Sequence, residues 1–383
     1  MIADWNSWRG RLRAASVALG APLAALFALP AWAEYGLNMT RGVTSISREV
    51  YDLHMIIFWI CVVIGVLVFG VMFYSVFAHR RSRHPKPADF HENTALEIAW
   101  TAIPFVILIA MAIPATKTLV DMEDASEADM TVQVTGYQWR WQYEYLDEDI
   151  SFFSNLDAAS RDAITGDPSS VDNYLLEVDN RLVLPVGKRV RFLITAADVI
   201  HAWWVPALGW KQDAVPGFIN DAWATIDEPG IYRGQCAELC GRDHGFMPLV
   251  VEALSEEDYA AWVAEQQAAA EAAANSADRE WSQDELMERG EKVYKTYCIA
   301  CHQADGKGIP GAFPSMVGSP IVTGPIEGHI DVVMNGMPGT AMQAFAKQLN
   351  DVDIAAVVSF ERNSFGNEAG DYAQPRDIAA KRQ

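Results

Sequence analysis

Residues 236–247 read CAELCGRDHGFM, and this stretch decides the interpretation of the whole chain. It places Cys236, Cys240, His244 and Met247 close together, and His201 precedes it. Thiolates, imidazoles and thioethers suit copper, whereas Mg²⁺ and Ca²⁺ prefer carboxylate and carbonyl oxygens. Two thiolates on one loop can each bridge two metal ions. The stretch therefore predicts a dinuclear copper site.

A structural zinc site made of Cys236, Cys240, His201 and His244 is the main alternative. It leaves Met247 without a role, and the cysteine spacing departs from the common C-x₂-C pattern. Cysteines without a metal are a weaker alternative, because exposed thiols in an oxidising compartment tend to pair or oxidise. The chain of 383 residues has only five cysteines, which argues against a disulfide framework.

Residues 298–302 read CIACH, which is the attachment sequence of c-type haem. In this motif Cys298 and Cys301 take up the two vinyl groups as thioethers, and His302 becomes the proximal axial ligand. A thioredoxin-like redox pair is the alternative, but it would need a preceding strand. With its flanking segments the motif resembles a small class I cytochrome c: a helix over 285–297, a loop at 305–308 and an amphipathic helix over 351–362.

Four methionines follow the motif and can supply the second axial ligand: Met316, Met334, Met337 and Met342. Met316 is close to the motif and Met334 lies in a short apolar helical turn, which indicates packing. Small cytochromes c of this kind often place an aromatic residue three positions after the ligand, and Phe345 stands there after Met342. We therefore predict Met342 as the ligand, with Met337 as the alternative.

Three apolar runs point to a membrane. Residues 1–33 combine a basic start, an apolar run and a small-x-small cleavage site, which predicts a signal peptide. A third membrane helix is the alternative, although this run is short and contains Pro22. Uncharged runs over about 55–77 and 98–116 are long enough to cross a bilayer and have no polar face. The loop between them is basic, so the positive-inside rule places it in the cytoplasm and a large head outside.

The head begins with a β-domain. Residues 131–146, TVQVTGYQWRWQYEYL, alternate β-branched and aromatic residues with polar ones, as strands do. Glycine and proline separate further strand-like segments, as in a sandwich or barrel: 174–178, 181–184, 189–195, 222–226, 230–235 and 249–252. A helix and a linker follow, and the capping box Ser282-x-x-Glu285 opens the haem-binding part.

With these motifs the chain resembles cytochrome c oxidase subunit II, in the bacterial form that carries a C-terminally fused cytochrome c. The resemblance covers about 34–367 and rests on residues 236–247 and on the runs DVIHAWWVP (198–206) and GYQWRW (136–141). It implies a two-helix transmembrane hairpin, an all-β cupredoxin-like domain and an all-α class I cytochrome c domain. The expected organisation is a signal peptide at 1–33, the hairpin at 34–120, the copper A domain at 121–254, a helix and linker at 255–281, the cytochrome c domain at 282–367 and a C-terminal tail at 368–383.

The resemblance also implies roles for individual residues. The ligands of a dinuclear copper A centre would be His201, Cys236, the backbone carbonyl of Glu238, Cys240, His244 and Met247. The Glu238 carboxylate would bind Mg²⁺ at the interface with subunit I. Trp139 corresponds to the surface tryptophan through which electrons enter, with a stacked core tryptophan as the alternative. Glu97 corresponds to the mouth of a proton channel into subunit I, although a carboxylate at a helix end can be a mere interfacial anchor.

Two residues depart from the family pattern. Arg140 stands where many relatives carry an aromatic residue, and Phe218 stands where many have arginine. Neither departure removes a predicted ligand.

The implied function is electron transfer in a proton-pumping terminal oxidase. Haem c would accept electrons from an external donor such as a small cytochrome c, and copper A would pass them to the oxygen-reducing subunit I. The expected partners are subunits I and III and the bilayer of a bacterial inner membrane, with both cofactor domains on the periplasmic side. The net charge of −21 argues against nucleic acid as a partner.

A membrane-anchored periplasmic carrier serving another reductase is the alternative function, but one span would suffice to anchor a carrier. A quinol oxidase subunit II would lack the copper ligands present here.

Overall fold

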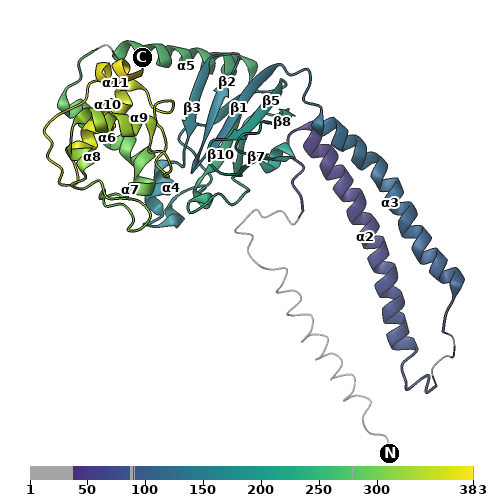
Figure 1. The fold of residues 1–383 in the computed structure, drawn as a ribbon. Coiled ribbons are helices and arrows are strands. Elements are labelled where there is room, and N and C mark those ends of the chain that lie inside the picture. Colours follow the sequence, from purple (N-terminus) through teal and green to yellow (C-terminus); the bar gives the residue numbers. More distant parts are fainter. Residues whose placement is uncertain (1–37, 87–88, 90, 278, 383) are drawn as a thin grey trace, which may run out of the picture. The chain divides into compact units, whose positions relative to one another are not determined.

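The computed structural model of the chain describes residues 38–86, 89, 91–277 and 279–382. The predicted signal peptide at 1–33 lies outside the described residues. Residues 41–383 form one compact unit. It begins with two long helices, continues with a β-domain and ends with a group of helices (Figure 1).

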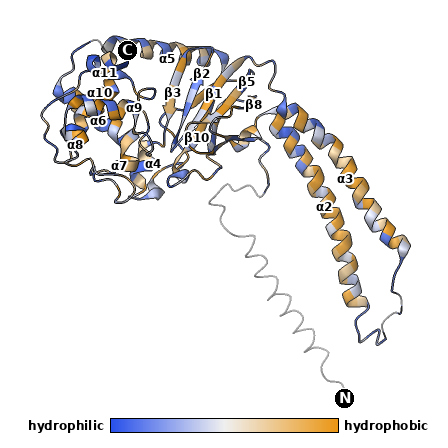
Figure 2. Ribbon diagram, in the orientation of Figure 1, coloured by the Kyte–Doolittle hydropathy of each residue, from blue (hydrophilic) through white to orange (hydrophobic). Residues whose placement is uncertain are grey.

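The two long helices are α2 (Ser45–Ala78) and α3 (Thr94–Glu123). Thr44 opens α2 with a capping box, and the Asn93 side chain caps α3. Their most apolar windows have mean hydropathies of 3.0 and 2.2, and apolar residues run along both helices (Figure 2). Both predicted spans lie inside these helices, which continue into the more polar residues on either side.

The β-domain contains three sheets. The strand orders are β3-β2-β1-β5-β8, β4-β10-β9 and β6-β7. The strands are β1 (Met130–Tyr137), β2 (Arg140–Tyr145), β3 (Ile150–Ser154), β4 (Leu182–Pro185), β5 (Arg189–Ala196), β6 (His201–Trp204), β7 (Lys211–Ala214), β8 (Asn220–Thr225), β9 (Gly230–Gln235) and β10 (Pro248–Leu254). Short helices lie in its loops: α4 (Ala158–Ala163), η1 (Pro168–Ser170), η2 (Pro206–Leu208) and η3 (His244–Phe246).

One apolar core holds the β-domain together. Val132 and Val134 of β1, Phe192 of β5 and Leu249 of β10 are completely buried and belong to the same cluster. The intervening residues of β1 and β5 are mostly more exposed, which is the period-two pattern expected of strands with one buried face. Because strands from the two larger sheets share this core, the domain is a β-sandwich, and the all-β prediction is confirmed.

The individual strand predictions differ from the structure in two ways. The segment 174–178 is not a strand, so that prediction is wrong: it forms turns, and only Val178 makes a bridge, to Leu156. The strands β3, β6 and β7 were not predicted. Both β6 and β7 have only four residues, too few for a period-two pattern to stand out.

The C-terminal part is helical, as predicted. Its elements are α5 (Glu256–Ala277), α6 (Gln283–Val293), the π-helical turn η4 (Tyr294–Cys298), α7 (Ile299–His302), α8 (Pro320–Thr323), α9 (Ile326–Asn335), α10 (Asp351–Arg362) and α11 (Pro375–Arg382). The predicted helix 285–297 therefore changes from α6 to a π-helical turn before the haem motif. Residues 368–383, expected as a tail, contain α11, whose Ile378 is buried in the core of the helical domain.

The haem motif is positioned by the contact between α6 and α10. A Cβ atom on Gly290 of α6 would lie 2.2 Å from the carbonyl oxygen of Ala356 on α10. Only glycine allows this close approach of the two backbones. Since η4 continues from α6, the crossing fixes where Cys298 begins the haem motif.

Candidate metal centre and haem pocket

The predicted copper ligands lie together at one end of the β-domain. His201 opens β6, Cys236 directly follows β9, and Met247 directly precedes β10. The Cys236 N–H donates to the Met247 carbonyl at 3.4 Å, and the Ala237 N–H donates to the Ala202 carbonyl at 3.0 Å. These backbone bonds close the loop 236–247 on itself and hold it against β6.

Neighbouring donor atoms in this cluster are 3.4–3.9 Å apart: Cys236 Sγ to Cys240 Sγ 3.9 Å, Cys236 Sγ to His201 Nδ1 3.9 Å, Cys236 Sγ to Glu238 O 3.4 Å, Cys240 Sγ to His244 Nδ1 3.4 Å and Cys240 Sγ to Met247 Sδ 3.4 Å. Two ligands held about 2.0–2.3 Å from one tetrahedral metal ion lie about 3.3–3.8 Å apart. The spacing therefore suits atoms that share metal ions.

The two sulfurs form the centre of the cluster. Cys236 has a histidine nitrogen and the Glu238 carbonyl beside it, and Cys240 has a histidine nitrogen and the Met247 thioether. A pair of metal ions held by these two similar ligand sets would share both thiolates, which fits a dinuclear soft-metal site. One zinc ion would use the thiolates and imidazoles and leave the carbonyl and the thioether without a role.

Asp198 orients the buried imidazole of His201, a predicted ligand. Its Oδ1 lies 2.9 Å from Nε2 of His201, which leaves Nδ1 to face Cys236. Burial by itself lowers the pKa of His201, but the hydrogen bonds to Asp198 and Cys236 outweigh burial and raise it. No role was predicted for Asp198, although it stands three residues before His201 in the run 198–206.

A hydrogen bond between the two cysteines shifts their pKa values in opposite directions. The hydrogen bond from the Cys240 thiol lowers the pKa of Cys236, and the same bond raises the pKa of Cys240. The pair therefore gives up its first proton readily, and a metal ion would displace the second. A thiol with a lowered pKa is typical of a metal or redox site rather than of inert core cysteines.

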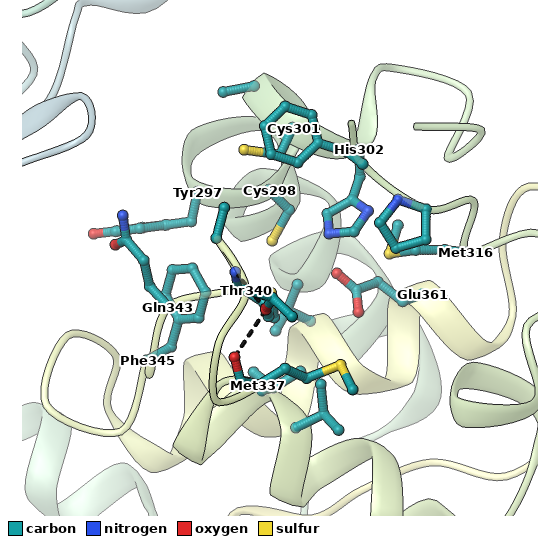
Figure 3. Close-up of a pocket in the computed structure, with 18 of the residues that line it drawn as sticks. Tyr297, Cys298, Cys301, His302, Met316, Met337, Thr340, Gln343, Phe345 and Glu361 are labelled. Carbon is teal, nitrogen blue, oxygen red and sulfur yellow. Dashed lines mark hydrogen bonds between the residues drawn. The ribbon is translucent and has the colours of Figure 1, made fainter. Parts of the chain in front are cut away.

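The haem-attachment motif lines a cavity of about 350 Å³. Cys298, Cys301 and His302 form one side of it, and Met337 lies on the opposite side (Figure 3). Much of the remaining wall is apolar: Ile321, Val322, Val332, Val333, Leu349 and Val357. The buried Nδ1 of His302 has no hydrogen-bond partner. Two cysteines and a histidine beside an apolar cavity fit a covalently attached haem.

Three of the four candidate methionines line this cavity. They are Met316, Met337 and Met342, whereas Met334 is buried in the core of the helical domain, as predicted. The Met337 N–H donates to the Met342 carbonyl at 3.1 Å, so both belong to one tight loop. Met337 is 40% exposed and Met342 is partly buried. Met342 as the axial ligand stays a prediction.

Two buried polar residues in the cavity wall were not predicted. Nε2 of His329, on α9, lies 2.9 Å from Oε2 of Glu361, on α10, and both residues are less than 5% exposed. In the sequence they are ordinary polar residues of amphipathic helices. Only the packing of α9 on α10 brings them together and gives the cavity a polar side.

Trp139 lies between the two candidate sites. Its Nε1 donates to the carbonyl of Cys240 at 3.2 Å, and the residue also lines the haem cavity. The other predicted functional residues lie apart: the Glu238 side chain is exposed, and Glu97 is exposed in the first turn of α3. Of the two departures from the family pattern, Phe218 is 68% exposed, whereas Arg140 is buried.

Family comparisons cover most of the chain. Residues 32–118 match the family described as "Cytochrome C oxidase subunit II, transmembrane domain", and residues 130–254 match "Cytochrome C oxidase subunit II, periplasmic domain". Residues 285–360 match "Cytochrome C oxidase, cbb3-type, subunit III". The three matches coincide with the hairpin, the β-domain and the helical domain.

Individual relatives carry the same description. The probable cytochrome c oxidase subunit 2 of Rickettsia prowazekii is 42% identical over 219 residues, 57% of this chain and 68% of that protein. Cytochrome c oxidase subunit 2 of Cereibacter sphaeroides is 40% identical over 242 residues, 60% of this chain and 79% of that protein. The crystal structure of the periplasmic domain of subunit II of cytochrome oxidase of Bradyrhizobium japonicum is 39% identical, covers 37% of this chain and 96% of that chain, and has a TM-score of 0.34. The chain therefore belongs to the cytochrome c oxidase subunit II family, as a membrane-anchored member with a periplasmic domain and a C-terminal cytochrome c domain.

Proposed function

We propose that the chain is subunit II of a proton-pumping cytochrome c oxidase and that it receives electrons at a covalent haem c and passes them through copper A to subunit I. The observation that carries the proposal is the donor cluster around Cys236 and Cys240, which adjoins Trp139 on the wall of the haem cavity. Family membership supports the oxidase as the place of action.

Each cofactor would have its own set of residues. Cys298 and Cys301 would hold the haem, with His302 and Met342 as axial ligands. His201, Cys236, Cys240, His244, Met247 and the Glu238 carbonyl would hold the copper pair, and the exposed Glu238 carboxylate would bind Mg²⁺ at subunit I. When bound, the haem and the copper pair supply one-electron carriers. The protein orients them, and Asp198 fixes the ring of His201.

The setting follows from the same proposal. The chain would lie in a bacterial inner membrane with subunits I and III, and the β-domain and the helical domain would face the periplasm. A small cytochrome c would deliver the electrons. Purification from native membranes separates this function from that of a carrier for another reductase: we expect a large haem-containing subunit to co-purify. A chain that purifies alone, or with a different reductase, would favour the carrier.

The metal content gives a direct test of the copper site. We expect two copper ions per chain, and an oxidised form whose unpaired electron is shared between both nuclei, because two ligand sets share both thiolates. Elemental analysis and electron paramagnetic resonance measure these two quantities. One copper per chain, a zinc ion, or an electron localised on one nucleus would contradict the dinuclear site.

A second test concerns Glu97, which is exposed in the first turn of α3. If it stands at a proton channel into subunit I, Glu97→Ala should slow enzyme reduction and turnover several-fold while copper and haem c still assemble. A carboxylate in this turn also interacts favourably with the helix dipole, worth about 0.3–1 kcal/mol. Glu97→Gln, which removes the carboxylate with little change in volume, should also lower turnover measured across pH. Turnover equal to wild type in both would leave Glu97 as an anchor.

A further inference from the structure

Arg140 joins the β-domain to the helical domain. It is the first residue of β2 and is only 5% exposed. Its guanidinium carbon lies 4.9–5.9 Å from four aromatic ring centres: Tyr137 and Phe153 of the β-domain, and Tyr297 and Phe345 of the helical domain. A cation among aromatic faces is attracted by the ring quadrupoles, most strongly where water is excluded.

The hydrogen bonds of Arg140 also cross to the helical domain. Its Nη2 donates to the side-chain oxygens of Gln343, at 3.3 Å, and of Gln348. Its Nε has no hydrogen-bond partner. Burial between the two domains removes the guanidinium of Arg140 from water, which costs free energy. The aromatic rings around it and the two side-chain amides that accept its hydrogen bonds offset that cost. Such a contact fixes one orientation of the two domains more than it adds affinity between them.

Gln343 extends the contact to the donor cluster. Its Nε2 donates to Oδ2 of Asp198 at 3.4 Å and to the carbonyl of Gln138 at 3.3 Å. The other oxygen of Asp198 is the one that holds His201. The Gln138 side chain donates to the carbonyl of Cys240 at 2.8 Å. A continuous set of hydrogen bonds therefore runs from the wall of the haem cavity to two predicted copper ligands.

A second arginine, Arg242, contacts Trp139. The guanidinium carbon of Arg242 lies 5.5 Å from the ring centre of Trp139 and 5.9 Å from that of Phe313. Arg242 also donates to the carbonyl of Ala300, inside the haem motif. Trp139 thus lies between the loop that carries Cys240 and the cavity that would hold haem.

We propose that Arg140 is a positioning residue: it fixes the helical domain on the β-domain so that Trp139 lies between the haem pocket and the copper site. The proposal rests on the proposed function, because it needs both cofactors. The step that it serves moves one electron, with no bond made or broken: the haem is oxidised by one electron and the copper pair is reduced by one.

The test measures electron transfer within the purified oxidase complex. A flash-activated ruthenium reductant reduces haem c, and absorbance at the haem and copper bands follows the first-order transfer. We expect Arg140→Met, which keeps length and apolar character, to slow this transfer several-fold, because the rate of electron transfer falls steeply as the distance between the two carriers grows. The haem c reduction potential and the copper content should stay as in wild type, since Arg140 binds neither cofactor.

Matched variants make the result decisive. Arg191→Met removes an exposed arginine of β5 whose partner is Asp221, within the same domain, and should transfer at the wild-type rate. Arg140→Lys keeps the charge without the planar guanidinium, and its transfer rate should lie between those of wild type and Arg140→Met.

If Arg140→Met lost a cofactor, Gln343→Leu would carry the test, because it removes only an amide and should also slow transfer. Transfer at the wild-type rate in cofactor-loaded Arg140→Met, or in its substitute, would overturn the inference. Absence of haem-to-copper transfer in the wild type would instead overturn the proposed function.

Discussion

Replacing Cys240 by alanine is expected to abolish copper binding and, with it, oxidase turnover. Cys240 Sγ contacts Cys236, His244 and Met247 at 3.4–3.9 Å, so its loss removes one of the two sulfurs that link the ligand sets. The single remaining thiolate and the side chains around it could not hold two metal ions side by side. Copper analysis of the purified complex and oxygen uptake measure the two effects.

Cys61→Ala is the matched control for this prediction. Cys61 is an exposed, unpaired cysteine of α2, away from the donor cluster in the sequence and in the fold. It should keep full copper content and wild-type turnover. Haem c should remain attached in both variants, because Cys298 and Cys301 belong to a different domain. A Cys240→Ala enzyme that retained two copper ions would contradict the predicted ligand set.

The second large effect is expected for Met342→Leu, a substitution that nearly conserves volume. If Met342 is the axial ligand, the sulfur-to-iron absorption band should disappear. The reduction potential should fall by a clear part of the roughly 0.8 V range that axial ligands span, because methionine ligation raises it. Absorption spectra and a redox titration of the full chain measure both changes.

Met337→Leu is the control within the same loop. Met337 also lines the cavity but is 40% exposed, and its backbone N–H already bonds to the Met342 carbonyl. We expect Met337→Leu to leave the sulfur-to-iron absorption band and the haem reduction potential nearly unchanged. If Met337→Leu showed the loss and Met342→Leu did not, the axial ligand would be Met337.

Features that depend on nearby residues could be predicted from the sequence. Uncharged runs of helical length predicted the hairpin, and CAELCGRDHGFM and CIACH indicated the two candidate cofactor sites, since most of the predicted ligands of each lie in one short loop. Tyr174–Val178 failed because its aromatic and apolar residues satisfy a strand pattern locally but find no neighbouring strand to pair with beyond one bridge. Strand formation requires that partner, and the sequence does not reveal it.

Features that depend on distant residues could not be predicted. Asp198 and Gln343 are far apart in the chain, as are Arg140 and Tyr297, and only the fold brings each pair into contact. The sequence shows Arg140 as a departure from the family pattern, but its contacts with Tyr297 and Phe345 appear only in the structure. The same holds for His329 and Glu361, which α9 and α10 bring together in the cavity wall.

The haem cavity is closed on one side by the β-domain, through Gln138, Trp139 and Arg140. The β-domain therefore supplies part of a pocket whose other walls come from the helical domain. The helical domain produced on its own would leave that side of the pocket open to water. Gln138 and Trp139, which both donate to the Cys240 carbonyl, are among the residues that cover it, so the two candidate cofactor sites have one wall in common.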